Sequence, residues 1–240
     1  MQNILKNSGL VLLKSPNYNT WQYAQFQKYI GNVVLEIGCG VGNLTQHILK
    51  DAQFVFSVDT KQEAIDFSQQ RFCNEKNIHI KHVDIFKESL RVYTDAEFDT
   101  LIFSNVLEHI KDDAIAMHTC YTLLQKKGGI LVLIVPAHHF LFGTLDTESG
   151  HHRRYTKKEI MHLALENNFI VKDIYAFNLI GALGWYINYC LFKRKNTNNT
   201  STTNQMTFFD EYLVPLSKFV EGLVRPPIGL SYIAILEAKK

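Results

Sequence analysis

Short apolar segments alternate with longer segments of helical periodicity between residues 33 and 136, and this alternation constrains the fold more than any other feature of the chain. The apolar segments are rich in β-branched side chains and are interpreted as buried strands: residues 33–37, 54–59, 78–84, 98–104 and 129–136. Helices are predicted between them, at about residues 43–50, 61–74 and 112–126. Because a repeated strand, helix and strand requires right-handed crossovers, we predict an α/β fold with a mostly parallel sheet and helices on both faces.

The flanking segments continue or interrupt this rhythm. Residues 17–31 have apolar side chains at helical spacing, and "TKKEIMHLALENNF" is a helix whose Thr156 and Glu159 form a capping box. Further strands are predicted at 169–177 and in the closing "SYIAILEAKK". Residues 178–223 differ, with an apolar piece, a polar low-complexity piece and an amphipathic piece, and are interpreted as a helical insert between the last two strands.

Composition sets the broad class. A chain of 240 residues with 46% hydrophobic content can bury one core, and 1–240 is expected to be a single domain. The net charge of +2 does not favour nucleic acid as a partner. Four scattered cysteines fit neither a zinc site nor a disulfide framework, and the first residues lack a signal-peptide pattern. A cytoplasmic protein is expected, and residues 178–195 are too short and polar to cross a bilayer of about 30 Å.

The stretch "VVLEIGCGVGNLT" predicts a ligand site. A strand leads through Glu36 into Gly38, Gly40 and Gly42, which allow a tight turn into a helix N-terminus with no side chain between the backbone and a ligand. A dinucleotide site would have its third glycine where Asn43 stands, so the spacing is instead E-x-G-x-G-x-G.

At these residues the chain resembles the class I S-adenosylmethionine-dependent methyltransferases, in particular a type 11/12-like subgroup of small bacterial enzymes. Further blocks carry the resemblance in order: an acid ends the second strand (Asp59), another ends the third (Asp84), and "FDTLIFSNVLEHI" and "KKGGILVLIVP" follow. The resemblance implies a Rossmann-like, doubly wound, seven-stranded sheet with an antiparallel last strand. It also implies S-adenosylmethionine as cofactor and S-adenosylhomocysteine as product.

The resemblance assigns roles to individual residues. Asp59 would accept both ribose hydroxyls, Asp84 and the Ile85 backbone would bind adenine, and Glu36 would fix the glycine loop and the methionine ammonium. Carbonyl groups of Ser104 and Asn105 would line the opposite wall. The implied cofactor-binding residues are Glu36, Gly38, Cys39, Gly40, Asp59, Thr60, Asp84, Ile85, Ser104 and Asn105.

Methyl transfer from a sulfonium depends mainly on positioning and desolvation, with a general base only where the nucleophile carries a proton. The candidate bases are His109, His152 and Tyr155, and spacing does not choose among them; for His109 a helix-packing role is equally open. The candidate acceptor contacts are Tyr18, Trp21, His139 and Arg154.

The stretch "ESGHHRRYTKKE" (148–159) has several possible meanings. Paired histidines at 138–139 and 151–152 match no standard ligand spacing, so no metal site is predicted. Arg153 and Arg154 either form a fork for an acceptor with a phosphate, carboxylate or sugar, or pair with acidic neighbours such as Asp146 or Glu148. Residues 136–155 are therefore interpreted as an acceptor-side loop.

The leading hypothesis is methyl transfer to a small molecule, enclosed by the 1–31 helical lead, the acceptor-side loop and the insert. Nucleic acid is not expected, because "SNVL" stands where many amino-methylating enzymes have Asp or Asn before Pro-Pro and an aromatic. A macromolecular acceptor is the alternative, as is a catalytically silent cofactor-binding partner with 178–195 at a membrane surface. The sequence does not identify the acceptor, its reacting atom, or whether the protein is a monomer or homodimer.

Overall fold

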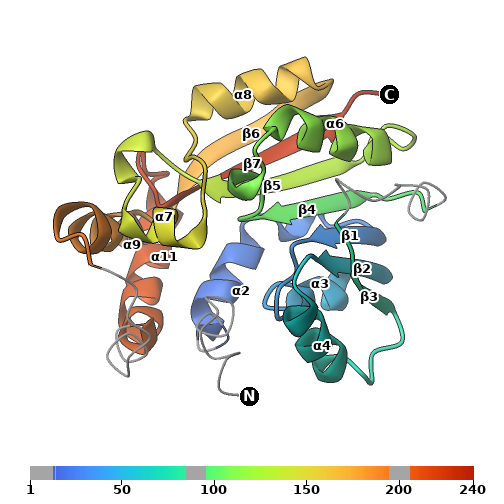
Figure 1. Cartoon of the computed structure of the whole chain (residues 1–240), viewed down its shortest axis with the longest axis horizontal. Helices are drawn as coiled ribbons and strands as arrows, with labels where there is room; N and C mark the ends of the chain where they lie inside the picture. The colour runs from blue at the N-terminus through green and yellow to red at the C-terminus, as the bar shows by residue number, and fades with distance from the viewer. Residues whose placement is uncertain (1–12, 14, 85–95, 195–205) are drawn as a thin grey trace.

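The computed structural model describes residue 13 and residues 15–84, 96–194 and 206–240. Within them, one seven-stranded sheet has the order β3-β2-β1-β4-β5-β7-β6 (Figure 1). The strands are β1 (Val33–Ile37), β2 (Phe54–Asp59), β3 (Ile78–His82), β4 (Thr100–Ser104), β5 (Ile130–Pro136), β6 (Phe169–Phe177) and β7 (Ser231–Ala238). β1 to β5 are parallel, and β7 is antiparallel to both β5 and β6. The predicted α/β fold with an antiparallel last strand is confirmed.

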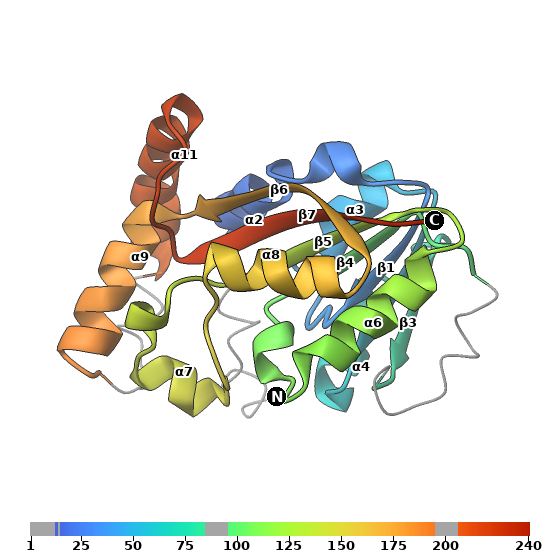
Figure 2. The same ribbon diagram turned by 90° about the horizontal axis from the view of Figure 1, so that it is seen from above.

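Helices cover both faces of the sheet (Figures 1 and 2). One face carries α2 (Pro16–Ala24) and α3 (Thr45–Asp51), and the other carries α6 (Asp113–Leu124) and α8 (Lys157–Glu166). α4 (Gln62–Arg71) packs on β2 and β3. Because the central strands are covered on both sides, the core is divided into two apolar clusters, one on each face of the sheet.

Local signals explain where several helices begin and end. Asp112 accepts a hydrogen bond from the backbone of Ile115 at the start of α6, and Thr156 and Glu159 form the predicted capping box of α8. The helix predicted over 17–31 is shorter than expected. It ends at Ala24 and is followed by the 3₁₀ turn η2 (Gln27–Tyr29), because Phe26 leaves helical backbone geometry (φ −129°) with its side chain fully buried.

Two connections project beyond the sheet. Between β5 and α8 lie η4 (His139–Leu141) and α7 (Thr144–Ser149). Between β6 and β7 lie α9 (Leu179–Trp185), the π-helical η5 (Tyr186–Leu191) and η6 (Phe209–Leu213), and α11 (Val214–Leu223), which together form the insert. The segment predicted to be a helical insert is therefore helical at residues 179–191 and 206–223.

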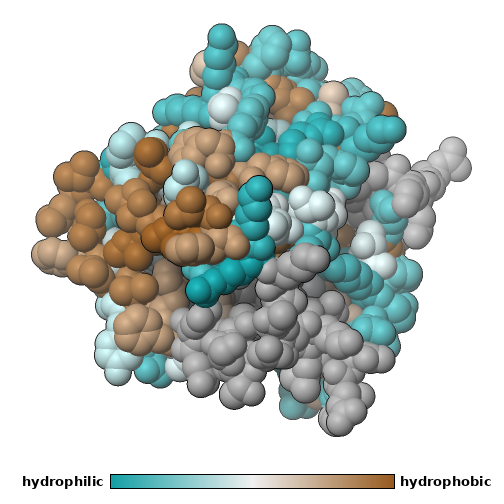
Figure 3. All heavy atoms as spheres, turned by 60° about the vertical axis from the view of Figure 1, so that its left-hand side comes forward, coloured by the Kyte–Doolittle hydropathy of each residue, from teal (hydrophilic) through white to brown (hydrophobic). Residues whose placement is uncertain are grey.

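The insert is anchored to α2 yet exposes an apolar surface. Buried Asp210 accepts hydrogen bonds from the backbone N–H groups of Asn17 (3.1 Å) and Tyr18 (2.8 Å), which lie in the first turn of α2. On its outer side, Leu183, Phe219 and Leu223 are 58%, 68% and 72% exposed, and hydrophobic residues dominate this part of the surface (Figure 3). Among the described helices, none is long and apolar enough to span a membrane.

Candidate cofactor and acceptor site

The glycine loop after β1 has one packed position and one open position. Gly38 (φ +77°) lies so close to the β4 side of the loop that a Cβ would be 2.2 Å from Val106. A Cβ on Gly40 (φ +55°) would meet no atom of the described residues within 4 Å. Both positions require left-handed backbone geometry, which glycine adopts without strain. The open side of Gly40 is therefore available to a ligand.

Side chains from neighbouring elements hold the Gly40 peptide in place. Asp59, at the end of β2, accepts hydrogen bonds from the backbone N–H groups of Gly40 (2.9 Å) and Lys61 (2.8 Å). Ser68 donates to the Gly40 carbonyl at 2.8 Å, and the Arg71 guanidinium donates to the carbonyls that follow it in the loop. The loop is thus preorganised, and the predicted ribose-binding carboxylate lies directly beside it.

Glu36 lies beneath the loop. Its buried carboxylate accepts hydrogen bonds from the hydroxyl groups of Thr45 (2.5 Å) and Ser57 (3.0 Å), which joins β1 to α3 and β2. Burial raises the pKa of Glu36 to about 7, and the two hydrogen bonds oppose that rise. These contacts support its predicted role in fixing the glycine loop.

The other predicted cofactor residues lie mostly at the same edge of the sheet. In the parallel register, Ile37 is paired with Val58 and with Phe103, so the carboxyl ends of β1, β2 and β4 are adjacent. Open α/β sheets bind ligands at this edge. Five more predicted residues lie at this edge: Cys39 is buried, Asp84 and Ser104 are half-buried, and Thr60 and Asn105 are exposed. The predicted Ile85 lies outside the described residues.

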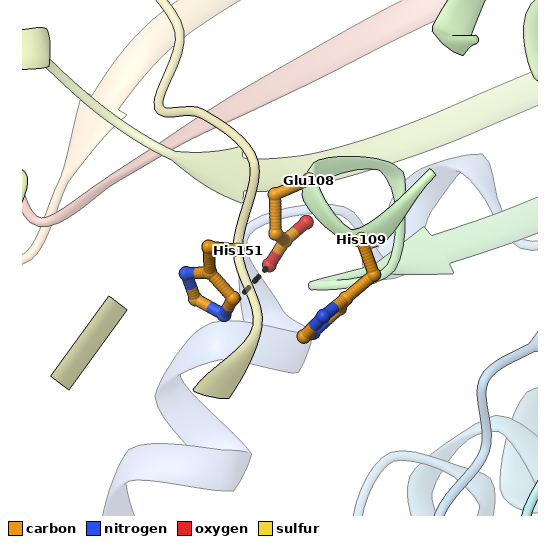
Figure 4. Close-up of side chains that lie close together, drawn as sticks. All are labelled: Glu108, His109 and His151. Atoms are coloured by element: carbon orange, nitrogen blue, oxygen red, sulfur yellow. Dashed lines mark ion pairs between the residues drawn. The ribbon is translucent and has the colours of Figure 1, made fainter. Parts of the chain in front are cut away.

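The turn η3 (Leu107–His109) follows β4 and brings Glu108 and His109 beside His151 of the acceptor-side loop (Figure 4). Glu108 is 0% exposed, and among the described residues neither of its carboxylate oxygens has a hydrogen-bond partner. Burial raises its pKa to about 8. Burial, followed by the neighbouring His151, lowers the pKa of partly exposed His109 to about 4, so this imidazole is neutral near pH 7.

Arg154 is directed into the protein rather than toward an acceptor. It is 3% exposed, its Nε lies 3.0 Å from both oxygens of buried Asp146, and its guanidinium lies over the Trp185 ring at 4.6 Å. Arg153 binds Asp113 at 2.7 Å. Of the two interpretations of these arginines, pairing with carboxylates is the one observed, although Arg153 pairs with Asp113 instead of Asp146 or Glu148.

Tyr155 and the predicted acceptor contacts are dispersed. The Tyr155 side chain is 3% exposed and its hydroxyl donates to Asp113 at 3.1 Å, away from the glycine loop. His139 is exposed and pairs with Glu159 at 2.9 Å. Trp21 is buried in the core, where half-buried Tyr18 packs against Phe177. Burial raises the pKa of Tyr18 to about 12.

Of the candidate bases, the two histidines are exposed, whereas Tyr155 is buried beside the end of β5. His109 belongs to η3, and exposed His152 donates its backbone N–H to the Glu108 carbonyl at 2.8 Å. The sequence predicted Asp146 only as a possible partner of the arginines, and it did not select Glu108 or His151 as site residues, although both belong to motifs that were singled out. The glutamate among apolar residues in "VLEHI" could have indicated a buried carboxylate, but the local sequence is equally compatible with an exposed helix start.

Comparison with known proteins places this geometry in a family. Residues 35–131 match the family model described as "Methyltransferase domain". A "Ubiquinone biosynthesis O-methyltransferase" of Methylococcus capsulatus is 28% identical over 99 residues, 41% of this chain and 41% of that protein. The chain thus matches about two fifths of the length of such curated relatives.

Solved structures share the whole fold. N-methyltransferase NodS from Bradyrhizobium japonicum, crystallised with S-adenosyl-l-homocysteine, has a TM-score of 0.62 at 15% identity, covering 100% of this chain and 96% of that one. The cyclase SpnF has a TM-score of 0.60 at 13% identity, covering 93% and 80%. Residues 35–131 are thus similar to a methyltransferase domain, and the strand order belongs to a fold that this chain shares with solved methyltransferase structures.

Proposed function

We propose that this protein transfers a methyl group from S-adenosylmethionine to a small-molecule acceptor. The observation that carries the proposal is the preorganised Gly40 peptide, open on one side and held on the other by Asp59 and Ser68. A backbone fixed in this way accepts a polar ligand without reorganisation, and the hydrogen-bonding capacity of Asp59 suits a ribose diol.

Bound S-adenosylmethionine supplies an electrophilic methyl group on a sulfonium. The residues around it position the cofactor and the acceptor, shield them from water and take a proton from the acceptor. In this proposal Asp59 and Asp84 hold the nucleoside, Glu36 fixes the loop through Thr45 and Ser57, and Ser104 and Asn105 line the opposite wall. An acceptor heteroatom held in line would attack the methyl carbon, the carbon–sulfur bond would break with its electron pair passing to sulfur, and a proton on the acceptor would pass to a nearby base.

We assign the acceptor side to η3 and the loop that contains His151 and His152. His109 and His152 are the candidate bases, because both lie on segments next to the end of β4. Among the described residues, neither imidazole forms an ion pair with a carboxylate that would occupy its nitrogen atoms. The names of the relatives support oxygen or nitrogen as the acceptor atom. An acceptor phosphate or carboxylate has lost its earlier support, since both arginines of the loop are already paired.

Isothermal titration with S-adenosylmethionine tests the cofactor part of this proposal. We expect binding to the unmodified chain and a loss of roughly 100-fold in Asp59→Ala, because one or two charge-assisted hydrogen bonds disappear. Asp66→Ala, an exposed carboxylate on α4, is the matched control and should bind normally. Absence of binding to the unmodified chain, or equal binding by both variants, would sink the proposal.

The acceptor requires a separate experiment. A screen of metabolite extracts with a methyl-labelled cofactor should transfer label to a low-molecular-weight product. Label on protein or nucleic acid would support a macromolecular acceptor instead. Cofactor binding without any labelled product would favour the second candidate, a cofactor-binding protein with another role. That candidate is worth testing because SpnF, which shares this fold, is described as a cyclase.

A further inference from the structure

We propose that Glu108, His109 and His151 bind a divalent first-row transition-metal ion, such as zinc or manganese, at the carboxyl end of β4. Each residue offers one ligand atom, and these atoms lie within 4.8 Å of one another. In Figure 4 the three side chains converge from η3 and from the acceptor-side loop. Ligands of a tetrahedral ion are about 3.4 Å apart, because the bonds are roughly 2.0–2.2 Å long, so modest side-chain rotations close the site.

The buried carboxylate of Glu108 is the strongest indication of a ligand. Its side chain is 0% exposed, and within the described part of the chain both oxygens lack a hydrogen-bond partner. The nearest imidazole nitrogen is Nε2 of His151, at 3.9 Å from Oε1, too far for a hydrogen bond. A polar group buried without a partner costs folding free energy, and a bound cation would remove that cost.

The second indication is the orientation of His151. Its Nδ1 lies 2.8 Å from Oδ1 of Asp146, and Asp146 is itself held by Arg154 and by the backbone of Gly143. Histidines that bind metals commonly donate their other ring N–H to a carboxylate in this way, which fixes the tautomer and the ring. The buried Arg154–Asp146 pair therefore supports the ring that presents Nε2 to Glu108.

The donor set decides the class of ion. Two imidazoles and one carboxylate suit zinc, manganese, iron or cobalt, whereas magnesium and calcium prefer oxygen ligands throughout. Three protein ligands also leave at least one coordination position for water or for an oxygen of another molecule.

The location gives that open position a use. Val106, two residues before Glu108, packs on Gly38 of the cofactor loop, and the His109 ring is partly exposed. An ion here would coordinate a hydroxyl or carboxylate oxygen of the acceptor close to the methyl donor and would lower the pKa of a bound hydroxyl. With His109 as a ligand, His152 would be the remaining histidine available as a base. This consequence rests on the proposed function, whereas metal binding itself does not.

Metal titration of the full chain tests the inference without any activity measurement. The protein is treated with chelator, freed of it, and titrated with zinc or manganese by calorimetry; cobalt absorption spectra report the coordination of the ion. We expect one site, with affinity reduced roughly 100-fold or more in Glu108→Gln and in His151→Asn. Glu108→Gln keeps the side-chain shape and introduces no charge, so it is expected to fold.

Two histidine variants serve as controls. His152→Asn removes the neighbouring ring, and His162→Gln removes an exposed histidine of α8; both should bind the metal as the unmodified chain does. Equal affinity in Glu108→Gln and the unmodified chain, or a loss in the control variants of the same size, would overturn the metal site. Titration of the same preparation with S-adenosylmethionine separates this failure from failure of the proposed function.

Discussion

The cofactor side and the acceptor side of this molecule are built in opposite ways. On the cofactor side, backbone groups form the binding surface, and the side chains of Asp59 and Ser68 hold them from outside. On the acceptor side, the charged side chains face inward: Arg154 and Asp146 are 3% and 0% exposed and hold His151. The first surface depends on the backbone geometry that the glycines adopt, and the second depends on which way the side chains of Arg154 and Asp146 face.

The difference matters for interpreting charged motifs. A glycine pattern predicts backbone geometry directly, because few other residues tolerate a φ angle above zero. A cluster such as "GHHRRYT" does not state which of its side chains face solvent. Here the most conspicuous cation of the cluster, Arg154, supports a neighbour instead of binding a ligand.

The largest expected effect comes from breaking the inward network. Arg154→Met leaves the Asp146 carboxylate buried without its main counter-charge, and such a change costs about 3–5 kcal/mol of unfolding free energy. Urea denaturation followed by circular dichroism measures it. Lys172→Met, which removes a surface pair with Glu237, is the control and should change the unfolding free energy far less, because exposed ion pairs contribute little. A cost for Arg154→Met similar to that control would mean that the network is not structural.

Glu36 gives the cofactor side its own test, through pH. Its pKa is about 7 in the folded chain, above the ordinary 4.5 of a glutamate, so the folded state holds the proton more tightly. The contribution of protonated Glu36 to the unfolding free energy is complete below about pH 4.5 and is lost as the pH rises through about 7. Glu36→Gln keeps an acceptor for Thr45 and Ser57 but does not titrate. We expect its unfolding free energy to exceed that of the unmodified chain by on the order of 3 kcal/mol at pH 8.

Denaturation of both proteins between pH 5 and 8 checks this expectation, because other titrating groups are common to both and cancel in the difference. A constant difference across the range would show that Glu36 is not the buried acid described here. Ser57→Ala removes one of its two hydrogen-bond donors and should raise the pKa further, which shifts the loss of stability to higher pH.

The sequence predicted most of the sheet, because buried parallel strands are recognisable from composition alone. β1, β2 and β6 have the predicted bounds, and the capping box of α8 begins where Thr156 indicated. Two predicted strands, 78–84 and 98–104, were each two residues too long, because apolar Val83 and Phe98 lie just outside the hydrogen-bonded ladder.

The acceptor side was predicted less completely for a physical reason. Whether Arg154 faces solvent depends on Asp146, Trp185 and the carbonyl of Ala137, which come from three separate segments. Likewise, nothing local to "VLEHI" shows that Glu108 is buried beside a histidine more than forty residues later. Pairwise spacing rules for metal ligands describe single turns and helices, so they would not find a site assembled across two loops, such as the one proposed above.

Gly40→Ala measures how far the cofactor surface depends on backbone alone. Its φ of +55° makes alanine cost about 1 kcal/mol in the folded state, and the surrounding space accepts the methyl group. We nevertheless expect S-adenosylmethionine affinity to fall roughly tenfold, because the new side chain stands where the ligand approaches. Gly150→Ala is the matched control, with φ +77° and equally open space, and should lose stability but not cofactor affinity. Equal affinity in both variants would place the ligand elsewhere on the loop.

The smallest effect on folding is expected at the insert, the one region where apolar side chains face outward in number. Phe219→Ser together with Leu223→Ser alters side chains that are 68% and 72% exposed, so the unfolding free energy should change by less than about 0.5 kcal/mol.

If this surface meets a lipid bilayer, as proposed for the neighbouring 178–195 segment, co-sedimentation with anionic vesicles should fall in the double variant. Ile115→Ser, at a 57% exposed position on α6, controls for loss of a single surface hydrophobic residue and should leave co-sedimentation unchanged. Because the folded state is the same in all three proteins, a difference between them reports the surface and not stability. Unchanged co-sedimentation of the double variant would show that the exposed surface of α11 is not a lipid contact. The outward-facing apolar side chains of the insert would then serve either to enclose the acceptor or to associate with a second copy of the chain. Light scattering of the same proteins distinguishes these two roles.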